Sequence, residues 1–452
     1  MAREMQTKTP EQRLKEALVP RDEQPYAVPD NWCWVRAASI CTFIGGGTPD
    51  KSNPSYWGGN IPWASIKDIK GDRLSGTIDS ITEEGLNNSA ANMCMAGDLI
   101  LATRINPGDT IISDVDVAVN QDLKIVKSTI ASDYLHLSFK VMKPALAQKA
   151  SGSTVKGVKL ADVKALPIPF PPLAEQRRIV KRVEGLFAKL DEASQALKEM
   201  IGGSEERRSS MLRSAFNGDL TARWRAKRGM GLDSWDRTTI GKCCRVGSGG
   251  TPSRKNPANY VGVIPWVKTG EINWNCIVET EEHISQDALE TSSAKLYQPG
   301  AVLVAMYGMG QTRGKAALLE IPAATNQAVS VLEPDECLDR RYLYYFFMRN
   351  YWDIREQSIG GNQLNLSGTI IKQYEICLPS IEEQRAIADI LENALGKEAL
   401  ATSAAIERLE SIQAIKQRIL SDALRGRLDA NGSDDSNAKE QLLEMLEHQS
   451  AN

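Results

Sequence analysis

The sequence predicts an α+β protein in which two similar mixed α/β domains are separated by two long helices packed as an antiparallel coiled coil, with a pseudo-two-fold internal repeat. Three observations predict this class. The motifs of the first half of the chain return in the same order in the second half. Each half opens with short apolar runs between Gly, Pro and Asn residues, which is typical of strands and loops. Each half then ends with a long stretch of helical periodicity.

The repeat is a tandem duplication of about 200 residues. Two motifs return 203 positions later: Gly46-Gly47-Thr48-Pro49 as Gly249-Gly250-Thr251-Pro252, and Ile61-Pro62-Trp63 as Ile264-Pro265-Trp266. Small insertions raise the offset to 206 and then 208 for two further pairs, Asn120-Gln121 with Asn326-Gln327 and Glu175-Gln176-Arg177 with Glu383-Gln384-Arg385. A unit of this length is too long for a solenoid repeat, so each copy should contain a globular domain of its own.

Changes in composition give the expected domain boundaries. Apolar runs of strand type, such as Leu99 to Ala102 and Val302 to Ala305, fall inside the two globular parts. We expect an N-terminal segment at 1–29, a first domain at 30–172, a central helical spacer at 173–228, a second domain at 229–378, a distal helical spacer at 379–428 and an acidic C-terminal tail at 429–452.

The two spacers each carry an apolar stripe. In the first, residues at alternating spacings of four and three form a heptad seam: Ile179, Val183, Leu186, Leu190, Ala193, Leu197 and Met200. In the second, the stripe is less regular and comprises Leu391, Leu395, Ile406, Leu409, Ile412, Ile419 and Ala423. Neither stripe can stay exposed, so we expect the helices to pack on each other; packing of each helix on its own domain is the alternative. Gly202-Gly203 should interrupt the first helix.

Composition argues against several function classes. Eight cysteines without a CxxC spacing predict buried, reduced thiols, and neither a disulfide framework nor a zinc site. Three histidines leave little for a histidine-based triad or metal centre. No apolar run reaches the ~18 residues that span a bilayer, so we expect a cytoplasmic protein. The net charge of −3 does not by itself indicate a nucleic-acid partner.

Three motifs occur in the same order in both halves, between about Trp32 and Leu428: Gly-Gly-Thr-Pro, then Ile-Pro-Trp, then a Pro followed by Glu-Gln-Arg at the start of a long helix. This doubled pattern resembles the specificity (S) subunits of type I restriction-modification systems. The resemblance implies a non-catalytic subunit with two target recognition domains, each of which reads one half of a bipartite target in double-stranded DNA.

The resemblance also implies partners. In that family the helices set the spacer between the half-sites and dock two modification (methyltransferase) subunits, and restriction (translocase and endonuclease) subunits complete the complex. No cofactor is expected on this chain, because the resemblance places S-adenosylmethionine, ATP and Mg on the partner subunits.

Candidates for DNA binding are cationic and amide side chains on loops, because these residue types can form paired hydrogen bonds to base edges. In the first domain they are Lys67, Lys70, Arg73, Arg104 and Lys156. In the second domain they are Arg254, Lys255, Lys268, Arg313, Lys315, Asn362 and Gln363. A solvated surface role is the alternative for each. The Gly-Gly-Thr-Pro segments are interpreted as tight turns, and Trp63 and Trp266 as core anchors.

The residues that open the two long helices are Glu175, Gln176 and Arg177, and their repeats Glu383, Gln384 and Arg385. Acidic residues stabilise the first turn of a helix, so simple capping explains them. The family resemblance adds the alternative that they lie at the partner-docking surface.

Two segments loosely fit catalytic motifs. Phe43-Ile44-Gly45-Gly46-Gly47 fits a methyl-donor pattern, but the repeat has Val246 in place of the Phe. No (Asn/Asp)-Pro-Pro-(Phe/Tyr) motif occurs, and the nearest string is Phe170-Pro171-Pro172-Leu173. The segment from Gly308 to Lys315 lacks the spacing of a phosphate-binding loop, and a hairpin loop is the better interpretation. A single-chain DNA methyltransferase is therefore disfavoured.

A coiled-coil scaffold that binds proteins instead of DNA is the alternative from a different class. Sequence-specific DNA binding in the presence of modification subunits distinguishes the two functions. The tail contains a short amphipathic stretch, from Leu442 to Leu446, for which disorder and docking on a partner are both open.

Overall fold

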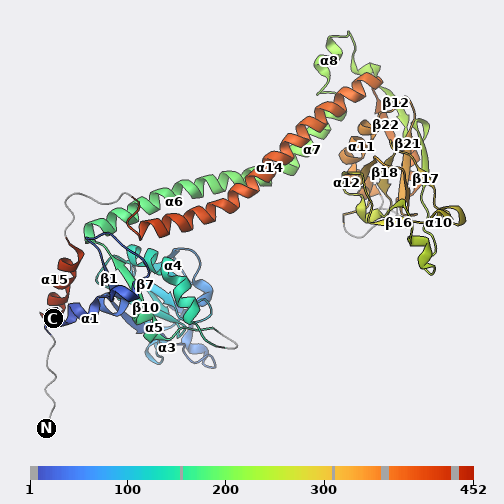
Figure 1. Ribbon diagram of the computed structural model, residues 1–452. Helices are drawn as coiled ribbons and strands as arrows, with labels where there is room; N and C mark the ends of the chain where they lie inside the picture. The colour runs from blue at the N-terminus through green and yellow to red at the C-terminus, as the bar shows by residue number, and fades with distance from the viewer. Residues whose placement is uncertain (1–8, 153–155, 308–310, 358–365, 429–436, 452) are drawn as a thin grey trace. The chain divides into compact units, whose positions relative to one another are not determined.

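The computed structural model describes residues 9–152, 156–307, 311–357, 366–428 and 437–451 (Figure 1). The chain divides into two compact units, one formed by Met1–Ala196 with Arg408–Asn452 and the other by Leu197–Glu407. Each unit holds one of the repeated domains together with parts of the long helices.

The first domain is closed by strands from its two ends, since β1 (Cys33–Arg36) pairs antiparallel with β11 (Pro167–Phe170). A five-stranded sheet has the order β2 (Cys41–Gly45), β10 (Leu123–Ser128), β7 (Leu99–Ala102), β8 (Thr110–Ser113) and β4 (Arg73–Leu74). A four-stranded sheet has the order β5 (Asp79–Ile81), β3 (Trp57–Ala64), β9 (Val117–Val119) and β6 (Asn92–Cys94). Short helices connect the strands: α2 (Ala37–Ile40), α3 (Glu83–Asn87) and α5 (Leu160–Lys164).

The second domain repeats this topology strand by strand. Its closing pair is β12 (Asp236–Thr239) and β22 (Glu375–Leu378). The five-stranded sheet has the order β13 (Cys244–Ser248), β21 (Val329–Pro334), β18 (Val302–Ala305), β19 (Ala316–Leu319) and β15 (Asn275–Ile277). The four-stranded sheet has the order β16 (Glu282–Ile284), β14 (Ile264–Val267), β20 (Ala323–Thr325) and β17 (Leu296–Tyr297). Its short helices are α9 (Ile240–Cys243), α10 (Gln286–Thr291), α12 (Tyr351–Gln357) and α13 (Gly368–Gln373), and α8 (Ala222–Ala226) precedes the domain in the chain.

Both domains mix parallel and antiparallel pairing at matching places. β3 and β4 run parallel to β9 and β8, and β14 and β15 run parallel to β20 and β19. The duplication in the sequence is therefore a duplication of topology, and the expected mixed α/β domains are confirmed.

One longer helix is anchored in the same way in each domain. In α4 (Ser132–Lys149) the Tyr134 hydroxyl donates to the carbonyl oxygen of Pro169 at 2.9 Å. In α11 (Arg340–Arg349) the Tyr342 hydroxyl donates to the carbonyl oxygen of Cys377 at 2.7 Å. Both tyrosine rings are buried, and burial raises the pKa of each hydroxyl. The hydroxyl bond satisfies the one polar atom of an otherwise apolar side chain.

In the first unit the start of α6 (Leu173–Gly202) packs beside the end of α14 (Ile381–Ala423). Val183 and Leu420 belong to the same core cluster, and Lys416 Nζ lies 2.5 Å from Asp191 Oδ1. Residue numbers rise along α6 while they fall along α14, so the two helices are antiparallel in this unit.

In the second unit α7 (Ser204–Phe216) packs beside the start of α14. Leu212 and Leu391 share a core cluster, and Arg207 Nη2 donates to Glu398 Oε1 at 2.7 Å. The direction is again antiparallel. Helix-on-helix packing is therefore confirmed in each unit. The alternative, packing of each helix on its own domain, is observed as well. The same core clusters include domain residues such as Phe170 and Tyr342.

The interruption at Gly202-Gly203 is confirmed, because α6 ends at Gly202 and α7 begins at Ser204. Two residues of the expected apolar stripes are exposed instead of packed between the helices. Ala193 is exposed, and the Ile406 side chain is 43% exposed. Two helices bury only a narrow strip between them, so residues at the margin of a stripe stay in solvent.

Two helices from the first and last described segments of the chain pack together on the first domain. α1 (Pro10–Ala17) lies beside α15 (Ala438–Ala451). Leu442 and Leu446 of α15 are buried in the core that also holds Trp34. Disorder, one of the two expectations for this stretch, is wrong for the described part of the tail, because Leu442 and Leu446 pack on the first domain. Docking of the tail on a partner stays a prediction.

All eight cysteines are free thiols. Five are buried, but Cys276 and Cys337 are exposed and Cys377 is half-buried, so the expected burial is wrong for these three. Among the described helices, none has the length and apolar content needed to cross a membrane.

Candidate DNA-reading surface

The Gly-Gly-Thr-Pro segment and the tryptophan of Ile-Pro-Trp hold each other in place in both domains. The indole Nε1 of Trp63, on β3, donates to the carbonyl oxygen of Gly47 at 3.0 Å. Trp266, on β14, donates in the same way to Gly250 at 3.0 Å. Both indoles are buried. These bonds support the interpretation of both motifs as structural.

Close packing, and not a tight turn, requires the glycines. A Cβ atom on Gly46 would lie 2.1 Å from the carbonyl oxygen of Asn120, and one on Gly249 would lie 2.1 Å from that of Thr325. Neither glycine has a positive φ. The expected tight turn is therefore corrected to a close approach of two backbone segments. Because the segment packs against its own chain, it leaves no space for a methyl donor.

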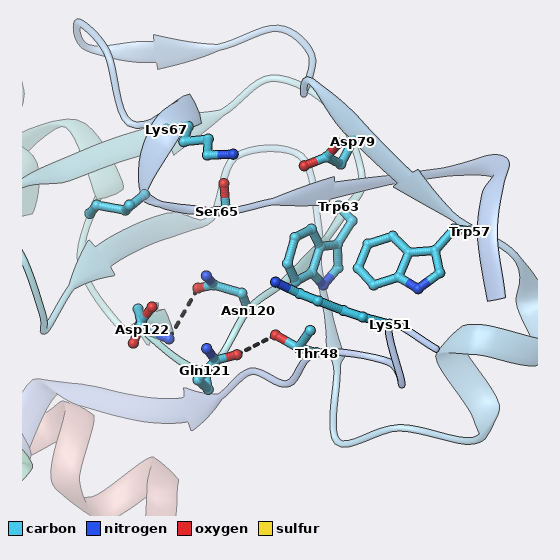
Figure 2. A pocket seen from close by; sticks show the side chains of 11 residues that line it. Thr48, Lys51, Trp57, Trp63, Ser65, Lys67, Asp79, Asn120, Gln121 and Asp122 are labelled. Atoms are coloured by element: carbon cyan, nitrogen blue, oxygen red, sulfur yellow. Dashed lines mark hydrogen bonds between the residues drawn. The ribbon is translucent and has the colours of Figure 1, made fainter. Parts of the chain in front are cut away.

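A pocket of about 460 Å³ opens beside this segment in the first domain (Figure 2). Trp57 and Trp63 form an aromatic wall, with ring centroids 5.1 Å apart and planes at 85°. The Thr48 hydroxyl donates to the side-chain oxygen of Gln121. The other lining residues are Lys51, Ser65, Ile66, Lys67, Asp79, Asn120 and Asp122. The pocket thus combines an aromatic surface with both signs of charge.

A buried carboxylate shapes the loop that follows β3. Asp68 Oδ2 accepts from the backbone N–H of Ser65 at 2.8 Å, and Asp68 Oδ1 accepts from that of Ile78 at 2.9 Å. These bonds close the loop at both ends. Lys67 and Lys70 lie within it and are exposed. Lys67 lines the pocket, whereas Lys70 lies further along the loop and does not.

The second domain builds the same loop with a different carboxylate. Glu271 Oε2 accepts from the backbone N–H of Lys268 at 2.6 Å, and Glu271 Oε1 accepts from that of Glu281 at 2.9 Å. Gly270 and Asn273 stand where the first domain has its two lysines. The frame of the loop is shared, and its exposed side chains are not.

The electrostatics of the second domain differ as well. Arg254 Nη1 lies 2.7 Å from Glu282 Oε2, and Lys268 Nζ lies 3.1 Å from Glu282 Oε1. Lys268 also pairs with Glu281 at 2.7 Å. The hydrogen bond from Arg254, with a further contribution from Lys268, holds the pKa of Glu282 below its usual value. These cations are therefore neutralised locally.

The chain matches a protein-family model in both of its repeats. The model is that of the type I restriction modification DNA specificity domain, and it matches residues 29–201 and 233–411. The chain belongs to this family. As a member, it is a DNA target-recognition subunit with two recognition domains, and catalysis belongs to other subunits.

Similar proteins agree with this assignment. The specificity subunit of the type I restriction enzyme MjaIX from Methanocaldococcus jannaschii is 22% identical, over 71% of this chain and 77% of its own length. The EcoKI specificity subunit from Escherichia coli strain K12 is 25% identical, over 63% of this chain and 62% of its own length. Among solved structures, the HsdS subunit from Thermoanaerobacter tengcongensis has a TM-score of 0.66 at 21% identity, covering 90% of this chain and 99% of that chain. Its likeness shows the fold.

Three DNA-binding candidates of this specificity subunit lie near one another in sequence but differ in pairing. No ion pair of Lys67 or Lys70 occurs within the part of the chain that the structure describes. Arg73 contacts two carboxylates, Asp114 at 3.2 Å and Asp133 at 2.6 Å. A phosphate would have to compete with those carboxylates for Arg73, so the two lysines are the more available cations.

Arg104 and Lys156 come together in a second place in the first domain. The carbonyl oxygen of Lys156 accepts from the backbone N–H of Ile105 at 2.9 Å, next to Arg104. Arg104 Nη1 lies 3.3 Å from Asp122 Oδ1, and Asp122 also lines the pocket. Both candidate side chains are exposed.

The second-domain candidates are grouped differently. Lys255 is exposed next to the paired Arg254. Lys315 Nζ donates to Asn273 Oδ1 on the loop after β14 at 2.6 Å. Arg313 and Lys315 lie between β18 and β19, whose antiparallel pairing confirms a hairpin in place of a phosphate-binding loop. Asn362 and Gln363 lie outside the described residues.

The first helix opening is largely buried. Glu175 Oε2 accepts from Trp32 Nε1 at 3.0 Å, and Gln176 Nε2 donates to the carbonyl oxygen of Pro171 at 2.9 Å. Glu175 and Gln176 are at most 1% exposed, whereas Arg177 is exposed. The first two side chains tie the helix start to the domain from inside.

The second helix opening repeats this arrangement and adds a buried cation. Glu383 Oε2 accepts from Trp235 Nε1 at 3.1 Å, and Glu383 Oε1 accepts from Arg225 Nη1 at 2.6 Å. Gln384 is also buried, and Arg385 is exposed. A direct role in partner docking stays a prediction for Arg177 and Arg385. The other four side chains are buried at the helix starts, and a place for them near a docking surface likewise stays a prediction.

Several residues of the pocket are neither cations nor amides, so they are not among the DNA-binding residues predicted from the sequence. Trp57 and Asp79 line it from neighbouring strands, β3 and β5. One signal was available in the sequence. Thr48 and Gln121 are both repeated at their offsets, and the second-domain copies form the same hydroxyl-to-amide bond.

Proposed function

We propose that this specificity subunit reads a bipartite target in double-stranded DNA, with one half-site assigned to the domain at 30–172 and the other to the domain at 229–378. One observation carries this proposal. The two domains share the loop frame held by Asp68 and Glu271, but differ at the exposed positions of that loop. Two domains that recognise different base sequences need the same loop backbone with different exposed side chains, and these two domains have that arrangement.

The exposed tips predict how the two domains differ. Lys67 and Lys70 of the first domain are cationic and exposed, so they suit phosphate or guanine contacts. The second domain has Gly270 and Asn273 at these positions, and its nearby Lys268 is paired with acidic residues. The second domain should therefore depend more on amide and apolar contacts.

Binding by the chain alone should be weak. Its net charge is −3, and much of the affinity of DNA-binding proteins comes from neutralised phosphates. We propose that two modification subunits dock on the helical spacers at 173–228 and 379–428 and close around the DNA, with restriction subunits joining them. S-adenosylmethionine, ATP and Mg would then be bound by those partners. Because the substrate is cellular DNA, the assembly would work in the cytoplasm.

The deciding experiment is a map of methylated bases across the host genome, with and without this gene. We expect loss of methylation at one split motif when the gene is removed, since only the recognition subunit selects the sequence. The same strain carrying the gene on a plasmid is the control and should recover the motif. An unchanged map in a strain with active modification subunits would contradict the proposal and favour a protein-binding scaffold.

A further inference from the structure

The pocket of the first domain has a counterpart in the second domain, and the two copies are occupied differently. The offset of 203 places Lys51, Trp57, Trp63 and Asp79 opposite Arg254, Tyr260, Trp266 and Glu282. Each copy therefore has one cation, two aromatic rings and one acid. The four residues of the first domain can therefore be compared directly with their four equivalents in the second domain.

In the second domain the chain fills this place with its own guanidinium. The Cζ atom of Arg254 lies 3.9 Å from the centre of the Tyr260 ring and 5.2 Å from that of Trp266. Its Nη1 lies 2.7 Å from Glu282 Oε2. The position thus holds a planar group whose face lies against an aromatic ring and whose N–H groups bond to a carboxylate.

In the first domain the same place is open. Within the described residues, no ion pair joins Lys51 to Asp79, and Lys51 is exposed. Figure 2 shows the Lys51 side chain reaching into the pocket beside Trp63 and Lys67 pointing towards Asp79, with no hydrogen bond drawn from either lysine to this carboxylate. A lysine carries a compact ammonium and has no planar group to replace the guanidinium. The aromatic wall and the acid are therefore left for another molecule.

The charge around the pocket selects the kind of molecule. Lys51 and Lys67 both line it, and both are exposed. Two carboxylates line it as well, but Asp122 is paired with Arg104 at 3.3 Å. The two lysines therefore favour the phosphate of a nucleotide over an arginine side chain of a protein partner. The occupant should therefore be planar, carry an amino group and be attached to a phosphate.

We propose that this pocket receives one amino-bearing base of the first half-site, unstacked from the DNA duplex. The base would lie against Trp57 and donate its exocyclic N–H to Asp79, and Lys51 and Lys67 would contact the neighbouring phosphates. Adenine, cytosine and guanine carry such an amino group and thymine does not. The proposal rests on the proposed function, and it names Trp57 and Asp79 as specificity-determining residues of the first domain.

The second domain supplies the test variant. Lys51→Arg gives the first domain the cation of the second, so the new guanidinium should fill the pocket and pair with Asp79. Arg254→Lys makes the opposite change in the other domain and serves as the matched control. Asp79→Asn keeps the shape and removes the charged acceptor, so it tests the pocket without filling it.

The first measurement is fluorine NMR of the full chain labelled with 5-fluorotryptophan, with the Trp57 signal assigned from Trp57→Phe. Deoxycytidine and deoxyadenosine monophosphates should shift this signal, and thymidine monophosphate should do so at least about tenfold more weakly. Lys51→Arg should abolish the shift, and Arg254→Lys should leave it unchanged. An equal response to thymidine monophosphate, or no response up to the solubility limit of all three nucleotides, would overturn the proposal.

The second measurement separates this proposal from the proposed function. In the host, Lys51→Arg and Asp79→Asn should each reduce methylation about tenfold at sites with the original base at one position of one half-site. If the wild-type chain directs methylation to a split motif and both variants leave that motif unchanged, the base pocket is wrong while the function stands. If the wild-type chain directs no methylation, the proposed function itself fails.

Discussion

At the residue scale, buried polar contacts decide how each helix joins its domain. Glu383 is fully buried and bonds to Arg225, Thr221 and Trp235. The Arg225 side chain is only 6% exposed, and within the described residues its charge is paired with this one carboxylate. A buried ion pair is sensitive to the removal of one partner, because the remaining charge is left uncompensated in a site of low polarity.

We therefore expect Glu383→Gln to lower the free energy of unfolding of the second unit by about 3–5 kcal/mol. The amide keeps the size of the side chain and removes the charge. Glu382→Gln, at the exposed neighbouring position, is the control and should leave the free energy of unfolding nearly unchanged. Urea unfolding followed by circular dichroism measures both. Equal effects of the two substitutions would show that the Arg225 charge is not compensated by Glu383.

The exposed lysines of the first domain give a second prediction at this scale. The double change Lys67→Ala with Lys70→Ala should weaken DNA binding by the assembled complex and affect only one half-site. If these lysines contact phosphates, the dependence of log affinity on log salt should become shallower by about two, one for each phosphate that is no longer neutralised. If they contact bases, the methylated motif should relax instead. Lys255→Ala is the control in the other domain, and altered reading of both half-sites by the first-domain variant would contradict separate readers.

At the element scale, features that depend on neighbouring residues could be predicted from the sequence. Features that depend on contacts between residues far apart in the sequence could not. The strands β7 and β18 were predictable because each is a short apolar run that follows a glycine closely, at Gly97 and Gly300, and is too short for a helix. The break between α6 and α7 was recognisable because two glycines disfavour helix locally. The role of Glu175 could not be recognised from the sequence, because Glu175 accepts a hydrogen bond from Trp32, which lies 143 positions away. The pocket was missed for the same reason, because β3 and β5 and the segment at Asn120 meet only in the folded chain.

The terminal helix α15 is the element whose position the sequence left open, and its packing is testable. Leu442 is fully buried in the first-unit core. Leu442→Ala should lower the free energy of unfolding of this unit by about 2–5 kcal/mol, because it leaves a cavity in addition to removing apolar contacts. Glu444→Ala changes an exposed residue of the same helix and should have little effect. Differential scanning calorimetry measures both, and an unchanged first-unit transition in the leucine variant would show that α15 does not stabilise the domain.

At the scale of the whole molecule, the long helices connect two recognition domains in one chain. The length of these helices should therefore set the number of base pairs between the two half-sites of the target. The ion pairs Asp191 with Lys416 and Arg207 with Glu398 mark two facing positions along the helices. Residues 192–198 and 408–414 lie between these positions. Each segment is one heptad, and each holds two residues of its apolar stripe, so removing both together keeps the stripes in phase.

We expect this double deletion to change the spacer of the methylated motif and neither half-site. At 1.5 Å per residue, seven residues correspond to about 10 Å of helix, which equals about three base pairs of duplex DNA. Deleting 192–198 alone is the matched control. It leaves the facing stripe one heptad too long, so the helices can no longer pair in register and methylation should disappear. Genome-wide methylation mapping reads out both variants. A folded double-deletion variant that methylates the original motif with its original spacer would show that helix length does not set the separation of the half-sites, and that the spacing is fixed by the partner subunits instead.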